Sequence, residues 1–426
     1  MKENNLNVNF KHVKPSATLL LNELSIQLIS EGKGVYRLGF GQSPFPIPNH
    51  IVKALQNNAH QKDYLPVKGL FALREEIACF FRNNYYLSTS AEDVLIGPGS
   101  KELIYNFQLA YEIDELLLPS PSWVSYEAQA QLTNHKVVWI ITEEKNDWKI
   151  KPEDLIRYCE KEPKKRRTII LNYPSNPIGI TYSIEELISL SKVFKQFNVM
   201  VIADEIYGEI HHEGKHQTIA KYYPEGTIIS TGLSKWAGAG GWRLGVFVFP
   251  NNLRYVLDSM SIIASETYTS TSAPIQFAAV EAYKENELTE LYIKNSRIIL
   301  KAVGSYVYNN LKSIGVTMPK PEGGFYLFPN FNKWKAGLKK RGIQNSKDFC
   351  NILLEETGVA LLPGEAFGHQ KEYITARLSY VDFNGQELLH LIEKFPETKV
   401  DDSFVEQNCP KIVLAIKKIE KWLKSL

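Results

Sequence analysis

The sequence contains few cysteines and no long apolar run. Its four cysteines are far apart and form no CxxC pair, which excludes a disulfide framework and favours a reducing compartment. No apolar stretch reaches the roughly 18 residues that a membrane helix needs, and the polar start of the chain lacks the apolar core of a signal peptide. We therefore expect a cytoplasmic protein that does not enter a membrane.

An excess of charge is also missing. The chain has 49 basic and 47 acidic residues, and its formal net charge is +2. Without a basic field it is not expected to bind nucleic acid, and any anion must be bound locally. The one dense basic run, Lys164–Arg167, is expected to be a solvated loop.

What is present is the pattern of an α/β protein. With 426 residues, 44% of them hydrophobic, the chain is long enough for two domains. Short β-branched runs alternate with stretches of helical spacing such as Ile184–Phe197, which predicts a mostly parallel seven-stranded sheet flanked by helices. The predicted strands are 93–96, 115–118, 136–142, 168–172, 199–203, 227–230 and 244–249. An amphipathic helix is predicted at 412–423, and the proline-rich segment 41–48 is predicted to be an extended strap.

Polar segments follow several of these strands, and in a parallel sheet the carboxyl ends of the strands form the ligand crevice. The turn Gly97–Lys101 enters a predicted helix and is suited to an anion, although such turns also occur without one. Asn176 lies in a loop held extended by prolines. Asp204 ends a fully apolar run, so it either caps a helix or requires a cationic or hydrogen-bonding partner.

A lysine follows the sixth predicted strand. Burial of Lys235 would favour its neutral, nucleophilic form, which is how lysines that form Schiff bases arise. Ser234 and Arg243 lie near it in sequence, and a hydroxyl and a guanidinium are both suited to a phosphate group.

Taken together, these motifs give the chain a family resemblance. It resembles the class I/II aminotransferases of the aspartate aminotransferase type, which are fold type I pyridoxal-phosphate enzymes. The motifs occur in the family's order over nearly the whole chain: Gly41–Phe45, Tyr64–Arg74, Gly97–Lys101, Asn172–Pro177, Asp204–Tyr207, Ser234–Lys235, Gly241–Gly245 and Ala376–Ser379. The resemblance implies a large cofactor-binding domain over 46–309 and a smaller α+β domain built from 1–45 and 310–426.

The resemblance implies that pyridoxal 5′-phosphate is bound as a Schiff base on Lys235. Asp204 would face the pyridine nitrogen and keep it protonated, so that the ring withdraws electrons when the substrate loses its α-proton. Tyr207 and Asn176 would hydrogen-bond the ring 3-oxygen, and Trp123 would stack on the ring. Lys235, Asp204 and Tyr207 are the expected catalytic residues.

Further roles follow from the same resemblance. The phosphate would be held by Gly99, Ser100, Lys101, Ser234 and Arg243, with Tyr64 reaching in from a second subunit of a homodimer. The substrate α-carboxylate would meet Arg377, assisted by Asn176 and the Gly41 backbone.

The choice of substrate is less determined by the sequence. In one subgroup a lysine at the position of Lys101 meets the distal carboxylate of aspartate or glutamate, so we expect an acidic amino acid and a 2-oxo acid such as 2-oxoglutarate. An aromatic or kynurenine-type aminotransferase and a lyase of the same fold, similar to aminocyclopropane-carboxylate synthase, stay open. Two features depart from the pattern: Gly232 replaces a hydroxyl residue of many relatives, and the segment 382–409 is longer than relatives need.

Other functions fit the sequence less well. The spacing around Gly97–Lys101 and Gly238–Arg243 matches neither a P-loop nor a dinucleotide fingerprint. His211, His212 and His216 are expected to be surface residues, and we predict no metal site. Only about forty residues precede Gly41, too few for the DNA-binding domain of a transcription regulator of the same fold.

Overall fold

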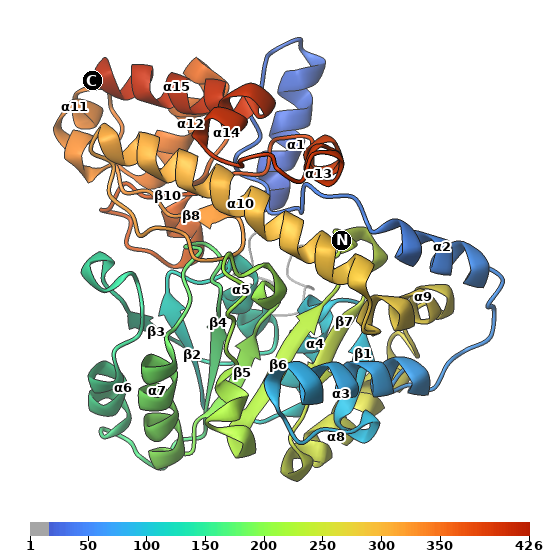
Figure 1. The fold of residues 1–426 in the computed structure, drawn as a ribbon. Coiled ribbons are helices and arrows are strands. Elements are labelled where there is room, and N and C mark those ends of the chain that lie inside the picture. Colours follow the sequence, from blue (N-terminus) through green and yellow to red (C-terminus); the bar gives the residue numbers. More distant parts are fainter. Residues whose placement is uncertain (1–16) are drawn as a thin grey trace, which may run out of the picture.

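The computed structural model describes residues 17–426 and contains two β-sheets with helices packed around them (Figure 1). All seven strands predicted for the large sheet are present, in the spatial order β1-β7-β6-β5-β4-β2-β3. They are β1 Val94–Gly97, β2 Glu115–Ser120, β3 Val137–Ile141, β4 Arg167–Asn172, β5 Met200–Asp204, β6 Thr227–Gly232 and β7 Gly245–Val248. β7 runs antiparallel to both of its neighbours and the other pairings are parallel, which confirms the mostly parallel α/β fold.

Both faces of this sheet are buried, because successive residues of its strands enter different hydrophobic clusters. Leu116 and Leu118 pack with one set of helices, whereas Leu117 packs with another on the opposite face. The first set is α4 Ser100–Ala110, α5 Val124–Leu132 and α8 Arg254–Glu266. The opposite face is covered by α3 Phe71–Tyr85, α6 Pro152–Cys159, α7 Ile184–Gln196 and α9 Ala273–Tyr283 (Figure 1).

The second sheet has three short antiparallel strands in the order β8-β10-β9. Its strands are β8 Tyr326–Leu327, β9 Leu362–Pro363 and β10 Ala376–Ser379. The helices outside the large-sheet layers are α1 Ala17–Ser30, α2 Asn49–Asn58, α10 Glu287–Ser313, α11 Lys335–Lys340, α12 Ser346–Thr357, α13 Gly385–Lys394, α14 Asp402–Asn408 and α15 Pro410–Lys424. The long helix α10 runs diagonally across the molecule beside the second sheet (Figure 1). The predicted domain boundaries stay a prediction, and the one at residue 310 lies within α10.

Local sequence signals account for several of these boundaries. α7 begins at a capping box in which Ser183 accepts the Glu186 backbone N–H and the Glu186 side chain accepts that of Ser183. α12 ends at Gly358, whose φ of +76° is the left-handed conformation that glycine adopts without strain. The segment 382–409, longer than expected, forms α13 and α14, which pack against α10.

Two expectations about surface residues are wrong. Arg167 begins β4 and is buried, and its Nε donates to the buried carboxylate of Glu115 at 3.0 Å, so only part of the basic run is solvated. His211, His212 and His216 are all buried as well. Burial lowers the pKa of both His211 and His212 to about 4, and His216 lies 3.0 Å from Glu205. Within residues 17–426, no cluster of three or more potential metal ligands is present.

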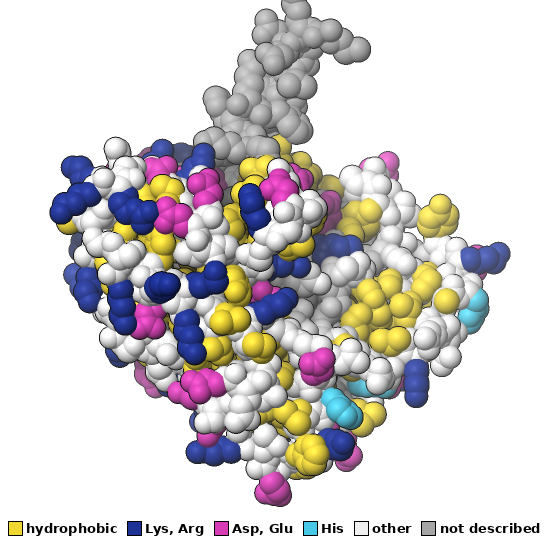
Figure 2. All heavy atoms as spheres, turned by 90° about the horizontal axis from the view of Figure 1, so that it is seen from above, with side chains coloured by type: hydrophobic (Ala, Val, Ile, Leu, Met, Phe, Trp, Pro, Cys, Tyr) yellow, Lys and Arg dark blue, Asp and Glu magenta, His cyan; other side chains and the backbone are white. Residues whose placement is uncertain are grey.

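The surface shows no single strongly charged face in the view from above. In that view lysine and arginine side chains are scattered, with acidic side chains between them (Figure 2). In the part of the chain that the structure describes, every helix is too short or too polar to span a lipid bilayer.

Candidate active site

The carboxyl edge of the large sheet brings together side chains that are far apart in sequence. In the register of the sheet, Asp204 at the end of β5 lies between Asn172 of β4 and Ser230 of β6. The turn after β1 and the segment before β7 reach the same edge, because β7 runs opposite to its neighbours. Asp204 is part of the strand and does not cap a helix.

Asp204 is a buried carboxylate with one satisfied oxygen. The phenol of Tyr126, from α5, donates to Oδ2, whereas Oδ1 has no hydrogen-bond partner among the described residues. Burial raises the pKa of Asp204 to about 6, while the hydrogen bond from Tyr126 and the charge of Lys235 act in the opposite direction. The free oxygen is available to a further donor.

Lys235 follows β6 and is half-buried at the same edge. Its Nζ donates to the carbonyl oxygen of Gly41 at 2.7 Å, which joins it to the strap at 41–48. Burial, together with the charge of Arg377, lowers the pKa of Lys235 to about 8, and Asp204 opposes the shift. Since Asp204 and Lys235 each alter the pKa of the other, they share one electrostatic environment.

The start of α4 and the Arg243 guanidinium lie next to each other at this edge. Gly99 is the N-cap of α4 with φ +96°, and a β-carbon at this position would collide with the Arg243 guanidinium. Arg243 donates to the carbonyl of Gly240 at 2.9 Å and lies close enough to lower the pKa of Lys101. The first N–H groups of a helix have no partner within the helix, and the N-terminal end of its dipole is positive, so this end of α4 is suited to an anion.

Arg377 is brought to the edge by β10 of the second sheet. Its guanidinium donates to Asn176 Oδ1 at 3.1 Å and to the Gly39 carbonyl at 2.7 Å, and its Nε has no partner among residues 17–426. The rings of Tyr326 and Phe367 flank it at 4.8 Å and 5.2 Å. Arg377 is 2% exposed, so it is a buried cation without a carboxylate partner in the described part of the chain.

Two tyrosines that sequence reasoning missed complete the site. Tyr126 contacts Asp204, and the Tyr326 hydroxyl lies 2.9 Å from the hydroxyl of Tyr207. Tyr126 stands one helical turn after Trp123, which is the only sequence signal that pointed to it. Tyr326 lies in β8, and nothing in the sequence indicated which way its side chain faces.

The remaining predicted residues lie around this core. The Lys101 ammonium is 4.9 Å from the centre of the Trp123 ring. Ser234 precedes Lys235 and is half-buried, with no side-chain contact that fixes its role. Tyr64 is 88% exposed and touches none of the groups described above. Gly232 cannot be replaced by a hydroxyl residue without adjustment, because its β-carbon would meet the Leu244 carbonyl oxygen at 2.6 Å.

Known proteins are similar to this chain in sequence and in fold. The family model "Aminotransferase class I and II" matches residues 33–395. The chain belongs to the class I and II aminotransferases.

The aspartate aminotransferase of Geobacillus stearothermophilus is 36% identical to this chain, and the match covers 86% of this chain and 92% of that protein. That from Bacillus subtilis is 33% identical over 90% of this chain and 96% of its own. The solved structure of aspartate aminotransferase from Thermus thermophilus with maleate matches with a TM-score of 0.82 at 27% identity, covering 93% of this chain and 99% of that one. The protein is therefore an aminotransferase, an enzyme that transfers amino groups, and the predicted fold and family are confirmed.

Proposed function

We propose that this aminotransferase binds pyridoxal 5′-phosphate between Asp204 and Lys235 and exchanges amino groups between an L-amino acid and a 2-oxo acid. The observation that carries the proposal is the free Oδ1 of buried Asp204 in the same environment as a lysine whose pKa is about 8. An ionised carboxylate suits a protonated pyridine nitrogen, and a neutral amine suits an aldehyde carbon.

The phosphate group also fits the residues present. The N–H groups of Gly99, Ser100 and Lys101 at the start of α4, the Ser234 hydroxyl and the Arg243 guanidinium would hold a dianion. Gly99 leaves the space beside Arg243 that a side chain would fill. Tyr207 and Asn176 would donate to the ring 3-oxygen, and Trp123 would cover the ring.

When bound, pyridoxal 5′-phosphate withdraws the electron pair left on the substrate Cα after its proton departs. Asp204 keeps the ring nitrogen protonated, and Tyr126 stabilises the ionised form of Asp204. Lys235 Nζ would take the proton from the substrate Cα, for which the amine must be neutral. A pKa of about 8 leaves a useful neutral fraction near neutral pH.

Arg377 is proposed to bind the substrate α-carboxylate with a bidentate pair, assisted by Asn176 and the Gly41 backbone. Support comes from its burial without a carboxylate partner among the described residues, since a buried guanidinium is stabilised most by a bound anion. The rings of Tyr326 and Phe367 restrict the guanidinium to one orientation.

For the second substrate carboxylate we propose Lys101, and therefore a preference for aspartate or glutamate, with a 2-oxo acid such as 2-oxoglutarate as acceptor. Lys101 and Arg377 both lie close enough to Lys235 to lower its pKa, so two cations surround the space beside this amine. The names of the Geobacillus and Bacillus relatives agree with this preference. Maleate, with which the Thermus aspartate aminotransferase was solved, is itself a dicarboxylate.

We also propose that the enzyme is a cytoplasmic homodimer in which Tyr64 hydrogen-bonds the phosphate held by the partner subunit. The exposure of Tyr64 in the single chain supports this, because a tyrosine with most of its ring in water is available to a second subunit. Fractionation of cells that express the chain tests the compartment.

The test of the proposed function mixes the cofactor-loaded enzyme singly with aspartate, glutamate, alanine, tyrosine and kynurenine. The absorption band of the lysine-bound cofactor should convert to that of its amino form, fastest with aspartate or glutamate, with one 2-oxo acid released per site. Lys235→Ala should lack the starting band. Equal rates for alanine would contradict the acidic preference, and faster reaction of tyrosine or kynurenine would favour an aromatic or kynurenine-type enzyme. Elimination products in place of the 2-oxo acid would favour the lyase.

A further inference from the structure

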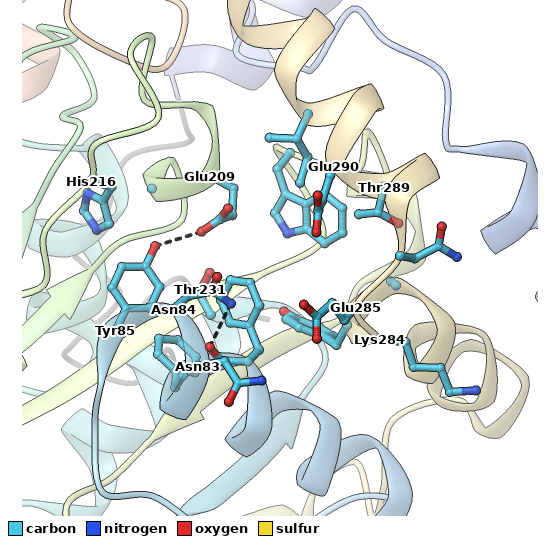
Figure 3. Close-up of a pocket in the computed structure, with 18 of the residues that line it drawn as sticks. Asn83, Asn84, Tyr85, Glu209, His216, Thr231, Lys284, Glu285, Thr289 and Glu290 are labelled. Carbon is cyan, nitrogen blue, oxygen red and sulfur yellow. Dashed lines mark hydrogen bonds between the residues drawn. The ribbon is translucent and has the colours of Figure 1, made fainter.

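A separate cavity lies between the end of α3, the start of α10 and the ends of β5 and β6 (Figure 3). Its volume is about 680 Å³, within the range of roughly 300–1,000 Å³ typical of small-molecule sites. None of the residues assigned above to the cofactor or substrate lines it. It is therefore distinct from the candidate active site and does not depend on the proposed function.

Aromatic side chains form part of its wall. The Tyr283 ring makes edge contacts with Phe80 at 5.9 Å and with Trp236 at 6.2 Å between centroids. The three rings offer one apolar surface made from α3, α9 and the segment after β6. Such a surface suits the hydrocarbon part of a ligand, and the faces of aromatic rings also attract cations.

Two buried polar atoms on residues that line the cavity have no hydrogen-bond partner in the described structure. They are the hydroxyl of Tyr283 and Nδ1 of His216, and both residues are 7% exposed. A buried polar group without a partner costs about 1–3 kcal/mol, so native proteins leave few of them. Both atoms are closed off from solvent, so neither is offered to a ligand in the open cavity.

Some of the charged residues at the cavity are already paired. Glu209 accepts from Tyr85 at 2.8 Å, as drawn in Figure 3, and lies 3.4 Å from Arg297. The Glu205 carboxylate accepts hydrogen bonds from three side chains, those of Tyr173, Thr218 and His216.

The charges that are left over are mostly negative. Three glutamates of the lining form no ion pair within residues 17–426: Glu76, Glu285 and Glu290. Of the two lysines of the lining, Lys284 pairs with Glu281, and Lys294 forms no ion pair with a described residue. Figure 3 shows Glu285 and Glu290 on the α10 side of the cavity, across from Tyr85 and Glu209. Three unpaired carboxylates against one ammonium give the opening a net negative charge.

We propose that this cavity binds a small organic cation that carries an aromatic or alkyl group. The aromatic wall takes the hydrocarbon part, and Glu285 and Glu290 attract the positive charge. An anion of the same size is excluded by the same carboxylates.

The test measures binding to the cofactor-loaded, full-length protein by isothermal titration calorimetry. The probe is (3-hydroxyphenyl)trimethylammonium, whose quaternary nitrogen cannot react with the active-site aldehyde. Its neutral counterpart is 3-tert-butylphenol, in which carbon replaces nitrogen and the shape is kept. The cation should bind with a Kd below about 1 mM and at least about fivefold more tightly than the neutral compound.

Variants then locate the site. Glu285 and Glu290 are exposed, so both can be substituted. The double variant Glu285→Gln, Glu290→Gln should lower the affinity for the cation at least about fivefold and leave the amino-transfer rate unchanged. Glu287→Gln, at an exposed position of the same helix end that does not line the cavity, is the matched control and should leave the affinity unchanged. Absence of saturable binding, equal affinity for the two probes, or an unchanged affinity in the double variant would each overturn the proposal.

Discussion

The charge on Asp204 is set by a few neighbouring groups. Burial favours its neutral form, whereas the Tyr126 phenol and the Lys235 ammonium favour the carboxylate. A hydrogen bond to a charged group contributes about 1.5–3 kcal/mol, so Tyr126 has a large share in keeping Asp204 ionised at neutral pH. Sequence reasoning found Asp204 but missed Tyr126, because the two are 78 residues apart and only the packing of α5 brings them together.

The first prediction concerns this contact. Tyr126→Phe removes a donor to the carboxylate, so the pKa of Asp204 should rise further and kcat/KM should fall about tenfold. The acid limb of the pH profile of kcat/KM should move to higher pH, because a higher pH is then needed to ionise Asp204. Tyr223→Phe, a buried tyrosine that precedes β6 at the opposite edge of the sheet, is the control. An unshifted acid limb would contradict the role given to Tyr126.

A second prediction at this scale concerns pH and Lys235. In the cofactor-free protein the lowered pKa means that the neutral amine, which reacts with an aldehyde, predominates above about pH 8. The rate of pyridoxal 5′-phosphate incorporation should therefore rise with pH and reach half its maximum near pH 8, well below the ordinary lysine value. Stopped-flow absorbance measures this rate. A midpoint above about pH 10, the ordinary lysine range, would show that the surroundings leave Lys235 unperturbed.

The lowered pKa of Lys235 also makes the free energy of unfolding depend on pH. The folded protein binds the Lys235 proton less tightly than the unfolded chain, so this group stabilises the fold fully only above the ordinary lysine pKa. The stabilisation is lost as pH falls from that value to about 8.

At the scale of elements, the turn between β1 and α4 depends on Gly99. Its positive φ and the Arg243 guanidinium next to it both oppose a side chain. The sequence alone indicated that this turn is suited to an anion, since glycine before a helix start is a local signal. It did not identify Arg243 as the group that fills the space, because that contact joins β1 to the segment before β7.

The third prediction follows from this turn. Gly99→Ala should displace Arg243 and weaken cofactor binding about tenfold or more, which titration of the cofactor-free protein with pyridoxal 5′-phosphate measures. Gly241→Ala is the matched control, because a β-carbon there meets nothing within 4 Å. Equal affinities of the two variants would show that the space beside Gly99 is not used for the phosphate.

At the scale of the whole molecule, residues from both sheets meet at one edge. Arg377 comes from β10, Lys235 from the end of β6, and the Gly41 carbonyl from the strap that crosses between them. In the proposed homodimer, Tyr64 of a second chain would join the residues that meet at this edge.

The fourth prediction tests that dimer by complementation. Tyr64→Ala should weaken cofactor affinity about tenfold or more, and Lys235→Ala should be inactive. A mixed dimer of the two variants has one site with an intact Lys235 and the intact Tyr64 of the partner. Mixing equal amounts after mild dissociation should therefore restore tight cofactor binding and activity at one of the two sites of each mixed dimer, which is about one site in four overall if the chains pair at random. No recovery on mixing would indicate that Tyr64 acts within its own chain or not at all.

The sequence by itself determined the family, the seven strands and the residues that end them, because these depend on local patterns: apolar runs, glycine turns and motif order. Only the tertiary structure decided which groups surround Asp204, Lys235 and Arg377, since those contacts join segments far apart in the chain. It also decided that Arg167 and the three histidines are buried, and that a second cavity with excess negative charge exists beside α10. Burial and charge balance depend on how helices pack over a sheet, and no local stretch of sequence carries that information.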